Sequence, residues 1–92
     1  MRTVRESVIE KRLCHEAAAR GWLCWKLHAD SVAGIPDRLL LGPGGRTVFV
    51  ELKRAGEKPR PIQNYQHERL RSLGFEVHVI DNVDDIRKVF DI

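Results

Sequence analysis

Hydrophobic and polar positions alternate with two different periods along this chain, and the longer period comes first. Between residues 4 and 20 the apolar side chains recur at the spacing of one helix face: Ile9, Leu13, Cys14 and Ala17. Thr3 and Glu6 have the T-x-x-E spacing of a capping box, and Gly21 is a suitable residue to end a helix. The pattern therefore predicts an amphipathic helix over residues 4–20 with one buried stripe.

Four shorter segments have the composition or the alternation of β-strands: residues 22–27, 37–41, 47–53 and 75–79. The second and third are separated by the five residues GPGGR, so they predict a hairpin whose turn is centred on Gly44. That register places Asp37 opposite Glu51, with Lys53 on the same face as both. The other face of the third strand is apolar: Val48, Val50 and Leu52.

Two more helices are expected in the second half of the chain. Pro61 suits a first helical position and Gly74 suits a helix end, so a helix is predicted from about residue 62 to 73. A short last helix is expected near the end of the chain, capped by Asp81 or Asn82. Its apolar positions are Val83, Ile86, Val89 and Phe90.

The resulting order, α-β-β-β-α-β-α, favours an α/β fold in which helices flank a mixed four-stranded sheet. A chain of 92 residues is expected to form one domain over residues 1–92. No apolar run approaches the roughly 18 residues needed to cross a bilayer, so no membrane partner is expected. The charged N-terminus lacks the apolar region of a signal peptide, which predicts a cytoplasmic protein.

Cysteine spacing and charge narrow the possible sites. Cys14 and Cys24 have no CxxC spacing and are interpreted as small core residues with free thiols, and the spacing of His67 and His78 leaves them as predicted surface residues. The net charge is +3, which suits a polyanionic partner without identifying one. Four basic residues gather in eight positions at the end of the third strand and just beyond it: Lys53, Arg54, Lys58 and Arg60.

The hairpin register brings unusual chemistry together. Like charges directly opposite each other on neighbouring strands are destabilising, so the pairing of Asp37 with Glu51 carries a cost that a bound cation would reverse. Carboxylate oxygens suit Mg²⁺ or Mn²⁺, which commonly complete their coordination with phosphate oxygens. Such a metal activates water and neutralises charge at a phosphodiester, and Lys53 would position the attacking water. Glu10 is a further carboxylate at the edge of the first helix's apolar stripe.

These residues match a family. The segment G-I-P-D, ending at Asp37, and the segment E-L-K, from Glu51 to Lys53, resemble the PD-(D/E)XK nuclease signature. The order G-x-PD, an apolar strand ending in ELKR, a short basic loop, Gln63 and then Gly74 is similar to that of the VRR-NUC nuclease domain. The resemblance covers essentially the whole chain and implies a restriction-endonuclease-like αβββαβ core in a stand-alone protein of phage or bacterial origin.

The resemblance also implies roles for individual residues. It implies a metal site made of two carboxylates and one main-chain oxygen: Asp37, Glu51 and the carbonyl of Leu52. Lys53 would be catalytic, Glu10 would approach the metal directly or through water, and Gln63 would help hold the site or the lysine. One departure concerns the aromatic residue that the family often has three positions after the glutamine, because Gln66 stands there and Tyr65 comes one position earlier.

For substrate and assembly, the resemblance implies a homodimer that cuts branched DNA such as Holliday junctions. Phosphate contacts would come from basic residues beside the site: Arg38, Arg54, Lys58 and Arg60. Two alternatives stay open. One is a non-catalytic DNA-binding module of the same fold, which the intact Asp37, Glu51 and Lys53 disfavour, and the other is a nuclease that acts on flaps or linear DNA.

Overall fold

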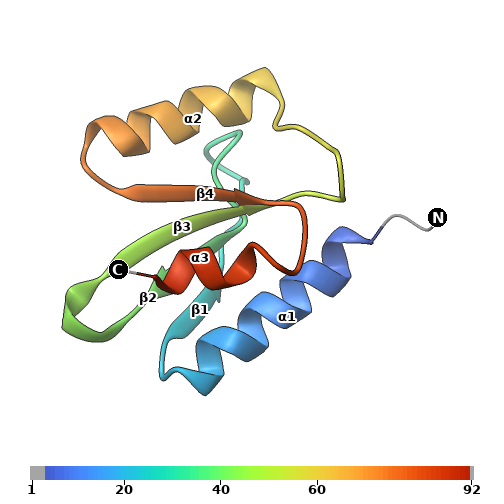
Figure 1. The fold of residues 1–92 in the computed structure, drawn as a ribbon. Helices are drawn as coiled ribbons and strands as arrows, with labels where there is room; N and C mark the ends of the chain where they lie inside the picture. Colours follow the sequence, from blue (N-terminus) through green and yellow to red (C-terminus); the bar gives the residue numbers. More distant parts are fainter. Residues whose placement is uncertain (1–3, 92) are drawn as a thin grey trace.

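The structure is a computed structural model that describes residues 4–91. Its elements, in chain order, are α1 (Glu6–Ala19), β1 (Leu23–Lys26), β2 (Arg38–Leu41), the short 3-10 turn η1 (Pro43–Gly45), β3 (Thr47–Leu52), α2 (Pro61–Ser72), β4 (Glu76–Ile80) and α3 (Ile86–Phe90). Figure 1 shows this succession. The predicted order of helices and strands is confirmed.

The four strands form one mixed sheet in the order β1-β2-β3-β4. The first three strands run antiparallel, and β4 pairs parallel to β3 after the crossover through α2. In the β2–β3 hairpin, Leu39 pairs with Phe49 and Leu41 pairs with Thr47, which is the register predicted from a turn centred on Gly44. Because the side chains of a strand alternate between faces, this register decides which residues share the site.

The two faces of the sheet differ in chemistry. Figure 1 shows α1 and α3 on one side of the sheet and α2 on the other. The face towards α1 and α3 carries the apolar core: Ile9, Leu13, Ala17, Leu40, Val48, Val50, Leu52, Ile80, Ile86 and Val89. Phe49 and Glu51 point the other way by strand alternation, and α2 buries Gln63 and His67 rather than apolar side chains. The core and the polar groups of interest therefore lie on opposite faces of one sheet.

The observed N-caps of α1 and α3 are Arg5 and Asp85. Thr3 lies outside the described residues, and α1 begins at Glu6, so Glu6 is the first helical residue rather than the third that a capping box requires. The last helix begins at Ile86, later than expected, because Asn82 stabilises a separate turn: its Oδ1 accepts the Asp85 backbone N–H at 2.9 Å. Asn82 thus caps the turn that precedes α3.

The loop that leads to β2 passes very close to α2 at Gly34. Gly34 has φ +84°, and a Cβ added there would lie 2.6 Å from the Ile62 main-chain oxygen. The glycine of the G-I-P-D segment is therefore required both by its backbone conformation and by this close approach.

Replacing Gly34 with alanine is expected to destabilise the protein by about 2 kcal/mol or more, from the left-handed backbone and the contact with Ile62 together. The matched control is Gly56→Ala, since Gly56 has φ +83° but no atom within 4 Å of an added Cβ. Denaturant unfolding of both variants measures the difference, and equal losses would show that the contact with α2 contributes nothing.

Candidate active site

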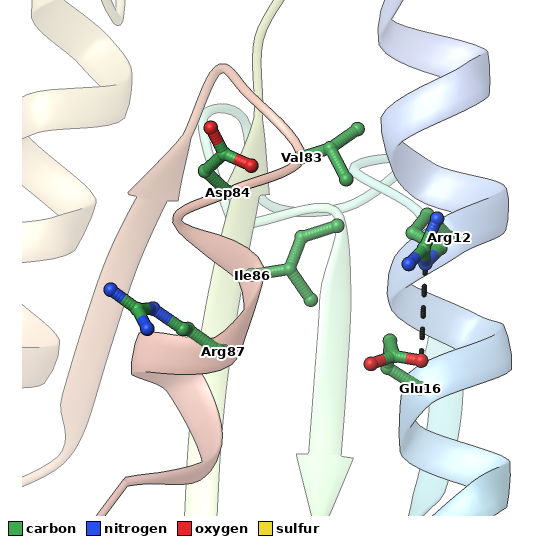
Figure 2. A pocket seen from close by; sticks show the side chains of 6 residues that line it. All are labelled: Arg12, Glu16, Val83, Asp84, Ile86 and Arg87. Carbon is green, nitrogen blue, oxygen red and sulfur yellow. Dashed lines mark ion pairs between the residues drawn. The ribbon is translucent and has the colours of Figure 1, made fainter.

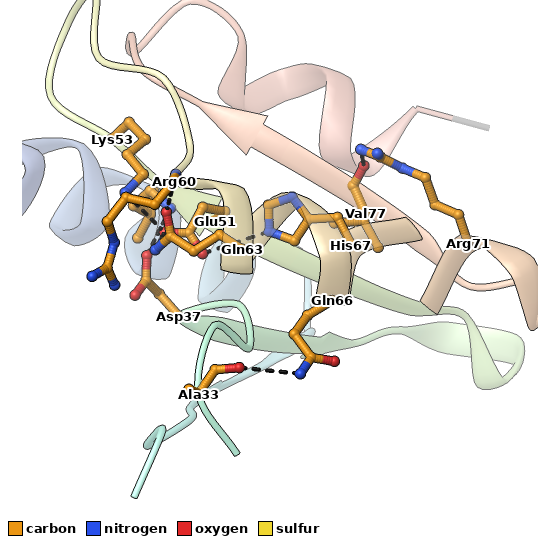
Figure 3. A network of polar contacts seen from close by, with 11 residues as sticks. Ala33, Asp37, Glu51, Lys53, Arg60, Gln63, Gln66, His67, Arg71 and Val77 are labelled. Carbon is orange, nitrogen blue, oxygen red and sulfur yellow. Dashed lines mark hydrogen bonds and ion pairs between the residues drawn. The ribbon is translucent and has the colours of Figure 1, made fainter. Parts of the chain in front are cut away.

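The site lies where β2 begins and β3 ends. Glu51 is the fifth residue of β3, and Lys53 follows the strand with its Nζ 3.5 Å from Glu51 Oε2. Asp37 directly precedes β2, and its Oδ2 accepts the Leu52 backbone N–H at 2.8 Å. Figure 3 shows Asp37, Glu51 and Lys53 gathered at this end of the sheet. The three residues predicted to share one face are thus brought together.

The predicted direct pairing of Asp37 with Glu51 is replaced by a more specific contact. The regular β2–β3 ladder ends at Arg38 and Val50, and the Asp37 N–H donates to the Val50 carbonyl at 3.1 Å. Asp37 therefore leaves the ladder and turns its carboxylate back onto the β3 main chain at Leu52. This hydrogen bond fixes one carboxylate oxygen beside the residue whose carbonyl was predicted to bind the metal.

Helix α2 holds the second carboxylate in place. Gln63 is buried in the first turn of α2, where its Oε1 accepts the Arg60 backbone N–H at 2.8 Å. Its Nε2 donates to Glu51 Oε2 at 3.1 Å. The Gln63 side chain thus caps its own helix and fixes Glu51 at once, which explains why a glutamine is needed near the start of this helix.

His67 is part of the same group, and its predicted place on the surface is wrong. Its exposed fraction is 1%, equal to that of Glu51, and its Nε2 lies 3.7 Å from Glu51 Oε1. His67 follows Gln63 by four residues, so both side chains point from the same face of α2 towards Glu51 (Figure 3). This spacing was the available sequence signal. His78, also predicted at the surface, is partly buried.

Burial and charge alter the ionisation of these groups. Burial raises the pKa of Glu51 to about 7, the negative charge of Asp37 adds to the rise, and the Lys53 ammonium opposes it. Burial lowers the pKa of His67, and the positive charges of Arg71 and Lys53 lower it further. His67 is therefore neutral at physiological pH, whereas Glu51 changes charge within the physiological range.

Glu10 lies in an ion pair. Its Oε2 is 2.9 Å from Arg38 Nε and 3.6 Å from Lys26 Nζ, and strand alternation places Arg38 on the face of the sheet opposite Asp37. Its role near a metal stays a prediction, as does the contact of Arg38 with phosphate.

The charges of the site also influence a different carboxylate of α1, the exposed Glu6. Burial raises the pKa of Glu6, and the charge of Asp37 raises it further while Lys53 lowers it. Glu10 was predicted as the α1 carboxylate near the metal, and Glu6, which lies one helical turn earlier on the same helix face, was not considered.

Two loops border the site: the loop before Asp37, which is hydrogen-bonded to α2, and the basic loop after β3. Gln66, at the position where the resemblance suggested an aromatic residue, donates its Nε2 to the Ala33 carbonyl at 3.1 Å and so links α2 to the loop before Asp37. In the basic loop, Arg54 pairs with Glu57 at 2.8 Å. Lys58 and Arg60 are exposed, and among residues 4–91 no ion pair is seen for either. These two side chains present their charge to solvent.

The donor set fits a hard divalent cation. Among the side chains described, no three or more of the His, Cys, Asp and Glu type gather closely enough to hold a metal. The site instead offers two neighbouring carboxylates and a main-chain oxygen, a set that leaves several positions for water and substrate, as Mg²⁺ and Mn²⁺ require. Glu51 Oε1 is buried without a hydrogen-bond partner, so this carboxylate is not saturated by the protein around it.

A separate groove lies between α1 and α3 and is lined by Arg12, Glu16, Val83, Asp84, Ile86 and Arg87 (Figure 2). It borders the apolar side of the sheet, away from Asp37 and Glu51, and its charged residues are solvated. The expected free thiols are confirmed at Cys14 and Cys24, whose sulfur atoms lie 3.2 Å apart. Neither feature contributes to the carboxylate site.

Comparison with known proteins agrees with the geometry. No model of a known protein family matches the sequence. A solved structure described as "VRR_NUC domain" superposes with a TM-score of 0.87 and 34% identity, covering 92% of each chain. The chain belongs to the VRR-NUC family. The phage protein named "Putative nuclease p44", from Acyrthosiphon pisum secondary endosymbiont phage 1, is 44% identical over 84 residues, which is 91% of this chain and 90% of that protein.

The family and its fold were therefore predicted correctly from the G-I-P-D and E-L-K segments. The mixed four-stranded sheet flanked by helices is the VRR-NUC fold. Within the part of the chain that the structure covers, no helix has both the length and the apolar character needed to cross a membrane.

Proposed function

We propose that this VRR-NUC protein is a Mg²⁺- or Mn²⁺-dependent endodeoxyribonuclease that hydrolyses phosphodiester bonds. The observation that carries the proposal is the pair of carboxylates, Asp37 and Glu51, held at one end of the sheet with Lys53 Nζ 3.5 Å from Glu51. A buried acid whose pKa is raised to about 7 is expensive to keep in the fold, which favours a function for it.

Each residue has a distinct role in the proposed reaction. A metal bound by Asp37, Glu51 and the Leu52 carbonyl would supply charge neutralisation and an activated water. The Lys53 ammonium orients the attacking water and stabilises negative charge on the transferred phosphate. Gln63 keeps the Glu51 carboxylate in place through its Nε2. Glu6 or Glu10 would complete the site from α1, directly or through water.

For the substrate, we propose branched DNA such as a Holliday junction, bound through its phosphates. The loop that follows β3 and Lys53 carries three exposed basic side chains that could contact phosphates: Arg54, Lys58 and Arg60. Recognition of the backbone by charge favours DNA shape over sequence. A phage or bacterial setting is supported by the phage origin of the 44% identical relative.

A homodimer suits this reaction because two symmetric cuts need two sites related by a two-fold axis. The apolar side chains of the edge strand β1 support it: Leu23 is 52% exposed and Trp25 is 54% exposed. Such side chains on an edge strand are typical of a surface that another subunit covers.

The direct test is cleavage of a labelled four-way junction. We expect cleavage in Mn²⁺ or Mg²⁺ and none in EDTA. Without a metal ion, the carboxylates can neither neutralise the phosphate charge nor activate a water molecule. Flap and linear duplex substrates in the same assay decide the substrate class, and faster cutting of either one would replace the junction proposal. Binding to the junction without cutting in any metal would favour the rival, a DNA-binding module that has lost its activity.

A further inference from the structure

Two buried polar atoms of the described residues have no hydrogen-bond partner, and they face each other. These atoms are Glu51 Oε1 and His67 Nε2, which lie 3.7 Å apart. An unsatisfied buried polar group is destabilising, so a protein that keeps two of them side by side departs from the usual pairing of buried groups. A leucine at position 67 would remove one of the two unpartnered atoms, His67 Nε2.

The two α2 side chains meet different oxygens of one carboxylate. Gln63 Nε2 donates to Glu51 Oε2, which is also the oxygen nearest Lys53 Nζ. His67 Nε2 faces Oε1 instead. Since two contacts define the plane of a carboxylate, Gln63 and His67 together fix its rotation, with Oε2 on the side of Lys53.

We propose that His67 is a positioning residue of the metal site, whose Nε2–H donates to Glu51 Oε1 and sets the orientation of that carboxylate. The inference rests on the proposed function. The 3.7 Å separation must shorten by less than about 1 Å to reach hydrogen-bond distance, which a small side-chain rotation supplies. Hydrogen-bond partners of ligating carboxylates typically contribute about 10- to 100-fold to metal affinity.

The direction of the hydrogen bond follows from chemistry. A metal-bound carboxylate is ionised and offers only lone pairs, so the opposing nitrogen must carry the hydrogen. A neutral histidine has one N–H, and His67 must therefore be the tautomer with the hydrogen on Nε2. The other tautomer would place two sets of lone pairs against each other in a buried space.

The test measures Mn²⁺ binding to the full chain by calorimetry, without DNA. His67→Leu is expected to weaken binding by about 10-fold or more. His67→Gln places an amide N–H near the Nε2 position and is expected to stay within about 3-fold of the unmodified protein. His78→Leu is the matched control, since His78 is a partly buried histidine on the other face of the sheet. A structural role alone predicts no rescue by glutamine.

A second measurement needs no variant. The ¹⁵N shifts of His67 in the Mg²⁺-loaded protein report the tautomer, and we expect hydrogen on Nε2. Hydrogen on Nδ1 with a bare Nε2, or unchanged Mn²⁺ affinity in His67→Leu, would overturn the positioning role while leaving the nuclease proposal intact. An unmodified protein that neither binds Mn²⁺ nor cuts DNA would overturn the proposed function and this role with it.

Discussion

Replacing Glu51 with glutamine is expected to raise the melting temperature at pH 8 while abolishing metal-dependent cleavage. Ionising Glu51 in its buried position is unfavourable, and this raises its pKa to about 7. Glutamine has the same shape and no charge. Its amide oxygen can face Gln63 and its amide nitrogen can face His67, which in this variant would take the tautomer with the hydrogen on Nδ1 and accept at Nε2, so that both buried atoms gain partners. The same substitution removes a carboxylate that the proposed metal requires.

The size of the stabilisation follows from the pKa. A rise from 4.5 to about 7 corresponds to roughly 3 kcal/mol at 1.36 kcal/mol per unit, a net value that already includes the attraction to Lys53. For a chain of this length that is a rise of about 10 °C or more in melting temperature.

The pH dependence has a definite sign. The folded protein binds the Glu51 proton more tightly than the unfolded chain, so its stability falls as the pH rises from 4.5 through about 7. The gain from Glu51→Gln should therefore be absent below pH 4.5 and complete above about pH 7. Thermal unfolding across this range measures it, with the exposed Glu57→Gln as control. A variant less stable than the parent at pH 8 would contradict the account.

Replacing Lys53 with methionine is expected to lower the rate of cleavage by at least 10²- to 10³-fold and to leave DNA binding nearly unchanged. Methionine keeps most of the partly buried stem and removes the ammonium beside Glu51. Single-turnover cleavage with saturating protein isolates the chemical step, and a binding titration in Ca²⁺ or EDTA measures affinity.

The exposed Lys58 supplies the opposite pattern as a control. Lys58→Ala should weaken junction binding and reduce its salt dependence by about one phosphate contact, with little change in the rate at saturation. Cleavage by Lys53→Met at the normal rate would remove the lysine from the mechanism. A loss of binding as large as that in Lys58→Ala would make Lys53 a phosphate contact instead.

The parts of the site that obey strand geometry could be predicted from sequence. The five-residue turn fixes the hairpin register, and the alternation of β3 assigns Glu51 and Lys53 to one face and Val50 to the other. Gln63 was found because it belongs to a recognised order of motifs. The bend that takes Asp37 out of the ladder was not predicted, because it depends on a hydrogen bond to Leu52 that no periodicity expresses.

Residues whose surroundings depend on tertiary contacts were predicted poorly. His67 was assigned to the surface because the histidines have no metal-binding spacing, yet it is one of the two residues that α2 buries. Glu10 of α1 pairs with Arg38 of β2, 28 positions later in the chain. Neither the helical pattern of α1 nor the alternation of β2 indicates this contact. Both cases concern polar groups, for which burial follows from partners rather than from hydrophobicity.

The parallel pairing of β4 with β3 has a consequence for the newly made protein. Glu51 belongs to the hairpin, whereas Gln63 and His67 belong to the crossover helix α2, which leads to the parallel strand β4. Such non-local parallel pairing is slow to form. A ribosome-bound or partly folded chain would hold the acidic residues without the helix that orients them. On the proposed function, the metal site would be complete only when the last strand is in place.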